Sequence, residues 1–173
     1  MQYKNTTIVC IFDGDKILMM RKSAGMKNFS AAVDGHGKGL YNFPGGKCKI
    51  NLETGAVQSF HDCAIEETRE ETGIIPVAPF LIGQLQFVWP DIVLVNQVFI
   101  TDKHTGVLKP KTEESKENLW VPVDKIPYDK MWPSDKIWVP HVLARRPFHM
   151  EVSGPADGPV CKSLPLDFSI RAR

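Results

Sequence analysis

Apolar side chains gather in short runs along the first hundred residues, and most of these runs have the length of a β-strand. Residues 6–12 and 16–21 are rich in β-branched and aliphatic side chains and flank a turn at residues 13–15, which predicts a β-hairpin. Residues 80–88 and 92–100 predict a second pair of strands joined by a short turn. The first of these pairs is expected to begin a sheet.

A helical pattern interrupts the strand-like runs between residues 59 and 72. Phe60, Ala64 and Thr68 recur every fourth position, so a helix places them on one packed side. Gly73 follows at once, and glycine readily adopts the left-handed conformation that ends a helix. This segment is therefore expected to be the first helix.

A second helix is predicted around residue 135. Ser134 or Asp135 can accept hydrogen bonds from the first free amides of this helix, and its end is expected near residues 145–146. Pro140 lacks an amide donor, so we expect a loose first turn with the regular helix beginning at this proline.

The remaining segments complete a mixed α and β pattern. Further strands are predicted at residues 118–121, 148–152 and 166–170, and the glycine-rich residues 23–40 predict a long surface loop. No linker divides the chain, so residues 1–173 are expected to form a single domain in which helices pack on a sheet.

Composition and charge narrow the range of functions. The chain has 173 residues, of which 43% are hydrophobic and 24% charged, as is ordinary for a soluble globular protein. A net charge of +1 supplies no basic field of the kind that polymeric nucleic acid selects, so a small phosphorylated substrate is expected instead. The apolar run at residues 8–12 is too short for a signal peptide or a membrane span. We therefore expect a cytoplasmic monomer with no membrane partner.

Four cysteines are present, and none belongs to a CxxC pair. Cys10 and Cys63 fall in a strand-like and a helix-like stretch, while Cys48 and Cys161 stand alone in the sequence. In a reducing compartment this pattern predicts free thiols.

Within the first predicted helix, glutamate recurs at positions that a helix brings together. Glu67, Glu70 and Glu71 stand at i, i+3 and i+4, so their carboxylates project from one face into one small volume. Like charges repel there, and a hard divalent cation is the natural compensation once the groups are desolvated. Oxygen ligands favour Mg²⁺, or Mn²⁺, over zinc. Taken alone, such a run more often marks a solvated helix face.

The residues around the glutamates favour the metal site. Residues 42–47 read Asn-Phe-Pro-Gly-Gly-Lys, and Gly73 closes the helix. This arrangement resembles the signature of the Nudix hydrolase family, which implies a Nudix-type mixed β-sheet sandwiched between helices. The positions that fit the end of the signature are Glu67, Glu70, Glu71, Gly73 and Ile74.

The chain also departs from the family signature. Thr68 replaces an aliphatic residue, Glu66 occupies the position of the family's arginine, and Gln58 occupies that of its first glutamate. Eleven residues separate Gly46 from Gln58 where the family has five, so residues 47–57 contain an insertion of six. A Gln58 amide can donate to a Glu66 carboxylate and preserve the family's tie between loop and helix.

An alternative places the first glutamate of the signature elsewhere. Glu53 can serve in that role if the insertion follows it. The departures also leave open a binding module that has lost catalysis.

The resemblance extends to the C-terminal half. Residues 131–135, Met-Trp-Pro-Ser-Asp, with Trp-Val-Pro at 138–140 and Phe-His at 148–149, are similar to the oxidised-purine nucleoside triphosphatases of the animal MutT-homologue branch. By this resemblance the substrate is a small nucleotide of the 8-oxo-dGTP type. The base-binding residues that it implies are Asn42, Phe87, Trp132, Ser134 and Asp135, with Ser134 replacing an acid.

The resemblance also implies a reaction. Mg²⁺, or Mn²⁺, held by Glu67, Glu70, Glu71 and the Gly45 carbonyl would activate water for attack on the phosphate chain, releasing a nucleoside monophosphate and pyrophosphate. The same three glutamates are the expected catalytic residues. A further catalytic acid is expected from the loop before Trp120, at Glu114 or Glu113, and the basic pair Arg21 and Lys22 is expected to offset phosphate charge. A Nudix enzyme for another nucleoside diphosphate derivative is the main alternative.

Overall fold

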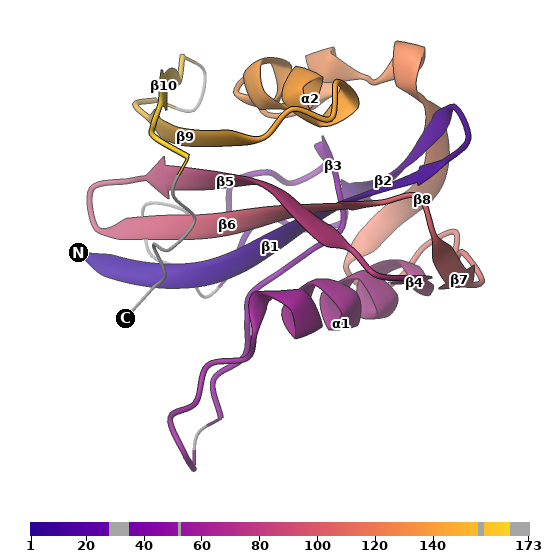
Figure 1. Cartoon of the computed structure of the whole chain (residues 1–173), viewed down its shortest axis with the longest axis horizontal. Coiled ribbons are helices and arrows are strands. Elements are labelled where there is room, and N and C mark those ends of the chain that lie inside the picture. Colours follow the sequence, from indigo (N-terminus) through magenta and orange to yellow (C-terminus); the bar gives the residue numbers. More distant parts are fainter. Residues whose placement is uncertain (28–34, 52, 156–157, 167–173) are drawn as a thin grey trace.

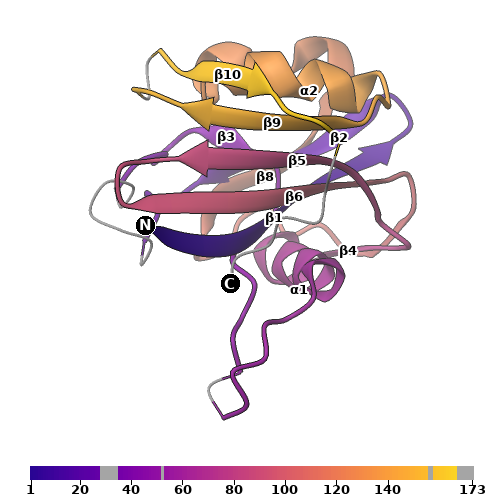
Figure 2. The ribbon, with the colours of Figure 1, turned by 60° about the vertical axis from the view of Figure 1, so that its left-hand side comes forward.

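A twisted mixed sheet lies between two helices in this computed structural model, which describes residues 1–27, 35–51, 53–155 and 158–166 (Figure 1). Helix α1 (Phe60–Thr72) covers one face of the sheet, and helix α2 (Asp135–Leu143) lies over the opposite side (Figures 1 and 2). The predicted fold class, a mixed sheet sandwiched between helices, is confirmed.

Eight strands of the described chain form the main sheet, in the order β10-β9-β5-β6-β1-β2-β3, with β8 paired to β2. These strands are β1 (Gln2–Asp13), β2 (Lys16–Lys22), β3 (Tyr41–Asn42), β5 (Phe80–Val88), β6 (Ile92–Thr101), β8 (Ser115–Pro122), β9 (Phe148–Ser153) and β10 (Val160–Ser163). The β1–β6 and β5–β9 pairs are parallel, and the other pairs in this sheet are antiparallel. Strands β4 (Ile74–Pro76) and β7 (His104–Gly106) form a separate antiparallel pair.

Strand β1 changes neighbours along its length, and this change creates space for a site. One edge pairs with β6 from Gln2 to Ile11, whereas β2 pairs with the other edge only at Phe12 and Asp13. Residues 44–48 fill the rest of that edge, because the Thr7 and Val9 amides donate to the Gly46 and Pro44 carbonyls at 2.9 and 2.8 Å. The glycine pair is therefore held against the middle of the sheet.

Alternation along β1 divides the apolar side chains between two cores. Ile8, Cys10 and Phe12 belong to the core beneath α2, whereas Val9 and Ile11 belong to the core beneath α1. Because both faces of the central strands are covered, these strands read as almost continuous apolar runs in the sequence.

Helix α1 begins and ends where its sequence predicts. The Ser59 side chain accepts a hydrogen bond from the Asp62 amide at 3.0 Å, and Gly73 closes the helix in the left-handed conformation with a φ of 78°. The predicted packed residues Phe60, Ala64 and Thr68 are all buried, which confirms the amphipathic pattern.

Helix α2 corrects the prediction that a regular helix begins at Pro140. The helix starts at Asp135 and contains Pro140 in its interior. Trp138, Val139 and Val142 are at most 1% exposed, and their packing holds the helix together across the amide that proline lacks. Neither Ser134 nor Asp135 caps this helix with its side chain, so that prediction was also wrong.

In the described chain, the last strand of the sheet comes before residues 166–170, where the last strand was predicted. Strand β10 occupies Val160–Ser163, Leu166 lies in a bend, and residues 167–170 lie outside the described residues. Of the predicted loop 23–40, residues 28–34 also lie outside them, and the described remainder contains no helix or strand beyond the end of β2 at Lys22. The short strands β3, β4 and β7 were not predicted, since two or three residues carry too little periodicity.

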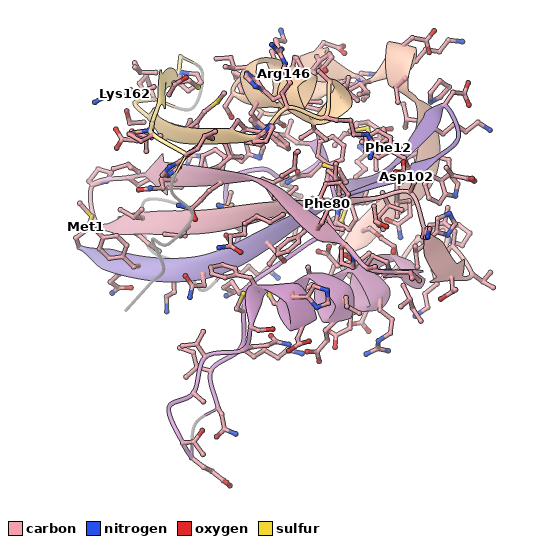
Figure 3. The ribbon with its side chains drawn as sticks, in the orientation of Figure 1. Met1, Phe12, Phe80, Asp102, Arg146 and Lys162 are labelled. Carbon is pink, nitrogen blue, oxygen red and sulfur yellow. The ribbon has the colours of Figure 1, made fainter. Side chains whose placement is uncertain are left out.

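The insertion forms an arm that projects from the body beside the start of α1 (Figures 1 and 2). Its two sides pair at Ile50 and Val57, and the Asn51 amide donates to the Ala56 carbonyl at 2.9 Å. Side chains on the arm extend into open space, in contrast to those that fill the layers of the body (Figure 3). Among the described residues, no helix combines the length and apolar character needed to cross a membrane.

Candidate active site

A cavity of about 1070 Å³ opens beside the edge of β1 that residues 44–48 cover, between the two helices. One end is lined by the glycine pair and by carboxylates of α1, and the other by residues that precede α2. The predicted site residues that line it are Lys22, Asn42, Gly45, Glu67, Glu71, Phe87, Glu114, Trp132, Ser134 and Asp135. The fold thus brings residues from six separate segments of sequence around one space of ligand size.

Both glycines of the pair are closely approached, Gly45 by backbone and Gly46 by a side chain. Gly45 has a φ of 139°, and a Cβ atom at this position would lie 2.2 Å from the Thr7 carbonyl oxygen. A Cβ atom at Gly46 would lie 1.8 Å from the Glu67 Oε2 atom. The glycines therefore allow this segment to lie between β1 and the acidic end of α1.

Glu71 is the most deeply buried carboxylate of the site. Lys22 Nζ donates to its Oε1 atom at 2.7 Å, and the Gly45 amide donates to its Oε2 atom at 2.9 Å. Full burial raises the pKa of Glu71 against the opposing influence of Lys22. Burial alone would lower the pKa of Lys22, but Glu71 and the neighbouring carboxylates reverse that effect and raise it. Lys22 therefore carries its charge into the acidic end of the cavity.

Glu67 faces the same end of the cavity and is half-buried. Burial, followed by the negative charges of Glu71 and Glu70, raises the pKa of Glu67 to about 7. Because burial and neighbouring charges disfavour the ionised form of Glu67, an additional positive charge nearby would stabilise that form.

Glu70 lies on the outer side of α1. Its side chain is 43% exposed and forms ion pairs with Lys49 at 3.4 Å and with Arg69 at 3.8 Å. Across the described ranges, no group of three or more acidic, histidine or cysteine side chains is arranged as a ready metal site. The structure thus brings Glu67 and Glu71 to the cavity while Glu70 turns toward Lys49.

The hydrogen bond expected from Gln58 to Glu66 is present. Gln58 Nε2 donates to Glu66 Oε2 at 2.6 Å, and Lys49 Nζ donates to the other carboxylate oxygen at 2.7 Å. Together these donors lower the pKa of Glu66, with Lys49 contributing most. Glu53, the alternative first glutamate, belongs to the inserted arm, where its amide donates to Asn51 Oδ1 at 2.9 Å. Gln58 therefore ties the loop to the helix in this chain.

The far end of the cavity is built around Asp135. Its Oδ1 atom accepts from Trp138 Nε1 at 2.9 Å, and its Oδ2 atom accepts from the Trp132 amide at 3.2 Å. Burial nevertheless raises the pKa of Asp135 to about 7, because both donors only partly replace water. Ser134 is also buried, and both residues line the cavity.

Asn42 and Trp132 contribute the remaining polar and aromatic surfaces of this end. Asn42 Oδ1 accepts from the Phe43 backbone amide at 2.8 Å. The two hydrogens on Asn42 Nδ2 are then oriented to bind another acceptor. Gly37 packs so closely on the Trp132 ring that a Cβ atom would lie 2.9 Å from it, and the His36 ring centroid is 6.5 Å away. The Trp132 ring is thus supported from the loop that follows β2.

Arg21 does not line the cavity, whereas both candidate acids do. Arg21 Nε donates to the Gly39 carbonyl at 3.1 Å, and its guanidinium lies 5.9 Å from the Tyr41 ring centroid, away from the residues that line the cavity. Glu113 and Glu114 both line the cavity, so the structure leaves both alternatives available.

Two asparagines near the site were not predicted. Asn96 lines the cavity from β6, and Asn118 Nδ2 on β8 donates to the Glu71 and Lys109 carbonyls at 2.9 Å each. Their only signal in the sequence is a polar residue inside an apolar strand. Asn118 thereby holds the end of α1 that carries Glu71.

Comparison with known proteins agrees with this geometry. The family model described as the NUDIX domain matches residues 2–142, and the chain belongs to the Nudix family. An oxidized purine nucleoside triphosphate hydrolase from Danio rerio is 27% identical over 147 residues, covering 84% of this chain and 83% of that protein. A protein of the same description from Mus musculus is 28% identical over 145 residues, covering 82% of this chain and 81% of that protein.

A solved structure shows the same fold. The MutT protein from Bacillus halodurans superposes with a TM-score of 0.75 at 21% identity, covering 95% of this chain and 99% of that chain. The protein is thus a Nudix hydrolase by family, with distant relatives among the oxidised purine nucleoside triphosphate hydrolases.

Nudix hydrolases generally use divalent metal ions, and the donors at the acidic end fit such an ion. Glu67 and Glu71 offer only oxygen atoms, which suits a hard cation. The raised pKa of Glu67 shows that its negative charge lacks compensation, which a divalent ion would supply.

Proposed function

We propose that this protein hydrolyses oxidised purine nucleoside triphosphates of the 8-oxo-dGTP type to a nucleoside monophosphate and pyrophosphate, with Mg²⁺ or Mn²⁺ as cofactor. The observation that carries the proposal is the position of Asp135. This buried carboxyl group lines the same cavity as Glu67 and Glu71, so a base-reading group and a phosphate-binding group share one space. A small nucleotide can occupy both ends together.

The base end offers groups suited to an oxidised purine. With a pKa of about 7, Asp135 is present in both protonation states at neutral pH, so it can accept from or donate to the edge of a base. 8-Oxoguanine carries a hydrogen on N7 where guanine carries a lone pair, and a carboxylate is the group that accepts from that hydrogen. The Trp132 ring supplies a surface on which a purine can stack.

Ser134 bears on the breadth of substrates. A hydroxyl group donates or accepts by rotation, whereas a second carboxylate beside Asp135 would couple to its titration. We therefore infer that this chain is less selective among purines than relatives with two adjacent acids, and that oxidised adenines are accepted as well.

The phosphate end would hold the metal through Glu67 and Glu71, with Glu70 and the Gly45 carbonyl as the further ligands suggested by the family resemblance. When bound, the ion would offset phosphate charge and lower the pKa of a coordinated water. Lys22 favours the charged form of Glu71 and orients its carboxylate through a 2.7 Å hydrogen bond, and the positive charge of Lys22 favours an approaching phosphate. Glu114, with Glu113 beside it, is the further acid that faces this end.

The deciding experiment compares release of pyrophosphate from 8-oxo-dGTP and dGTP, with and without Mg²⁺. The expected result is metal-dependent turnover with a higher kcat/KM for 8-oxo-dGTP. Asp135→Asn should reduce that preference, because an amide cannot change protonation state, and Asp129→Asn provides a control outside the cavity. A preference for sugar nucleotides or capped RNA in a parallel panel would instead favour another Nudix activity.

A nucleotide-binding module without catalysis is the second candidate, and one observation favours it. Lys22 and the Gly45 amide occupy both oxygens of Glu71, while Glu70 is engaged by Lys49. Tight binding of 8-oxo-dGTP without hydrolysis in saturating Mg²⁺ would support this candidate over the enzyme.

A further inference from the structure

Helix α1 carries two pairs of carboxylates, and each pair has different surroundings. Glu67 and Glu71 stand four positions apart and line the cavity. Glu66 and Glu70, also four positions apart, are not among the described residues that line it, and both accept hydrogen bonds from Lys49. Glu70, which the family resemblance implies as a metal ligand, therefore has a different partner from the two glutamates of the cavity.

Lys49 lies at the base of the inserted arm, where Gln58 holds it in place. The Lys49 amide donates to Gln58 Oε1 at 3.1 Å, and the Gln58 amide donates to the Lys49 carbonyl at 2.8 Å. Both side chains then bind Glu66, Gln58 Nε2 at 2.6 Å and Lys49 Nζ at 2.7 Å. These hydrogen bonds fix Lys49 against α1 and leave its ammonium group within reach of Glu70.

The contact between Lys49 and Glu70 is the looser of the two that Lys49 makes with α1. Lys49 Nζ lies 3.4 Å from Glu70 Oε1, and the two side chains are 53% and 43% exposed. Arg69 Nη2 lies farther from the same oxygen, at 3.8 Å. Because ion pairs with this exposure are weak, Glu70 can leave Lys49 readily, and Lys49 keeps Glu66 as a partner when it does.

We propose that Lys49 competes with a divalent metal ion for Glu70, so that the inserted arm lowers the affinity of the acidic end of the cavity for the metal. The competition rests on the proposed function, which takes Glu70 as a further ligand of that ion. Glu70 must leave Lys49 to share an ion with Glu67 and Glu71, which line the cavity. The carboxylate that the metal gains is therefore one that the arm loses.

The charge of Lys49 also acts on the cavity directly. Lys49 lines the cavity, and burial and the neighbouring carboxylates raise the pKa of Glu67 while the charge of Lys49 acts in the opposite direction. A divalent ion near Glu67 would thus be repelled by Lys49 in addition to competing with it for Glu70. The two effects are separable, because repulsion persists when Glu70 is replaced, whereas competition for Glu70 does not.

The experiment measures the dissociation constant of Mn²⁺ for the full-length protein without nucleotide, from the electron paramagnetic resonance signal of the free ion. Lys49→Met keeps the apolar stem of the side chain and removes its charge. The dissociation constant should fall about two- to fivefold, the range expected when an exposed ion pair no longer competes. Lys49→Arg keeps the charge and should give a value near that of wild type. Unchanged or weaker binding by Lys49→Met would overturn the competition.

A Glu70→Gln background separates competition from general repulsion. This substitution removes the carboxylate for which both cations compete, so Lys49→Met should improve Mn²⁺ binding clearly less than it does in wild type. An equal improvement in the two backgrounds would overturn the competition and leave repulsion as the cause.

Lys47→Met is the matched control in the wild-type background. It removes one positive charge from the same segment, at a residue that lines the cavity and whose Nζ donates to the Lys27 carbonyl at 3.1 Å. Its effect on Mn²⁺ binding should be smaller than that of Lys49→Met. An effect as large as that of Lys49→Met would show that any nearby positive charge acts alike, which contradicts a specific role of Lys49.

Activity is read separately from metal binding. The Mg²⁺ concentration that half-saturates turnover of 8-oxo-dGTP should be lower for Lys49→Met than for wild type. If Lys49→Met binds Mn²⁺ more tightly than wild type but neither protein hydrolyses 8-oxo-dGTP, the proposed function fails while the competition stands. If neither protein binds Mn²⁺, the proposed cofactor and the competition fail together.

Discussion

Gln58 Nε2 donates a hydrogen bond to Glu66 Oε2 at 2.6 Å, and this contact joins the end of the projecting arm to α1. Both residues depart from the family signature, yet they still form a tie between loop and helix. The family resemblance implies an ion pair at these two positions. In this chain a hydrogen bond from an amide to a carboxylate joins loop and helix instead, with one formal charge.

Gln58→Ala should weaken this tie without unfolding the protein. Because the Glu66 side chain is 34% exposed and retains Lys49 as a partner, we expect kcat/KM for the proposed substrate to fall by less than about tenfold. Gln58→Glu is the informative control, since it places two carboxylates together and should lower kcat/KM further. Equal activity of all three proteins would show that the tie has no influence on the site.

The partly buried pair of Lys22 and Glu71 should be strongly coupled. Glu71→Gln removes the buried partner of an ion pair whose lysine is 26% exposed, and we expect a loss of about 2 kcal/mol in the free energy of unfolding. Lys22→Met should have a comparable cost, and the double variant should cost less than the sum of the two. Urea unfolding in the presence of a chelator gives the free energy of unfolding of wild type, both single variants and the double variant. Strictly additive losses would contradict the coupling.

Asp135 should make folding stability depend on pH. Its ordinary pKa is 3.8, whereas the folded value is about 7. Between these values the unfolded chain has released the proton and the folded chain has kept it, so stability falls as pH rises through this window and levels off above it. The loss is at most about 4 kcal/mol.

Asp135→Asn removes this titration while keeping the shape of the side chain. The free energy of unfolding of wild type, relative to that of Asp135→Asn, should therefore fall from pH 5 to pH 8. Urea unfolding at several pH values tests this, and a difference that stays constant across the range would refute the raised pKa.

Divalent metal should stabilise the folded protein through Glu67. Binding to the folded state alone raises stability by about 2.7 kcal/mol when free metal exceeds its dissociation constant a hundredfold. Mg²⁺ should accordingly raise the melting temperature of wild type in a thermal-shift assay, and Glu67→Gln should reduce this response.

Glu53→Gln is the matched control for the metal experiment. It removes the same carboxylate chemistry from the projecting arm, so its response to Mg²⁺ should equal that of wild type. If Glu67→Gln and Glu53→Gln respond alike, Glu67 is not part of the metal site.

Local patterns in the sequence determined the elements whose causes are themselves local. Ser59 and Gly73 bound α1 through hydrogen bonds to residues within one turn of each end, so the sequence contains the whole argument for its limits. The strands β5 and β6 are predominantly apolar, and their predicted bounds agree with the structure to within one residue. The placement of Glu67 and Glu71 on the same side of α1 likewise required only the helical period.

Tertiary contacts decided the features that depend on residues far apart in the chain. Helix α2 starts before Pro140 because buried neighbours compensate for a missing amide, and β4 pairs with β7 although each strand has only three residues. The turn of Glu70 toward Lys49 follows from the path of the inserted arm.

One physical reason separates the features that the sequence determined from those that tertiary contacts decided. Propensity, capping and periodicity act over a few residues and can be read along the chain, whereas the free energy that selects a rotamer or a partner comes from atoms that folding brings together. Gly46 lies beside Glu67 only because residues 44–48 complete the open edge of β1. The sequence by itself determined which chemical groups are available, and the packed sheet decided which of them meet.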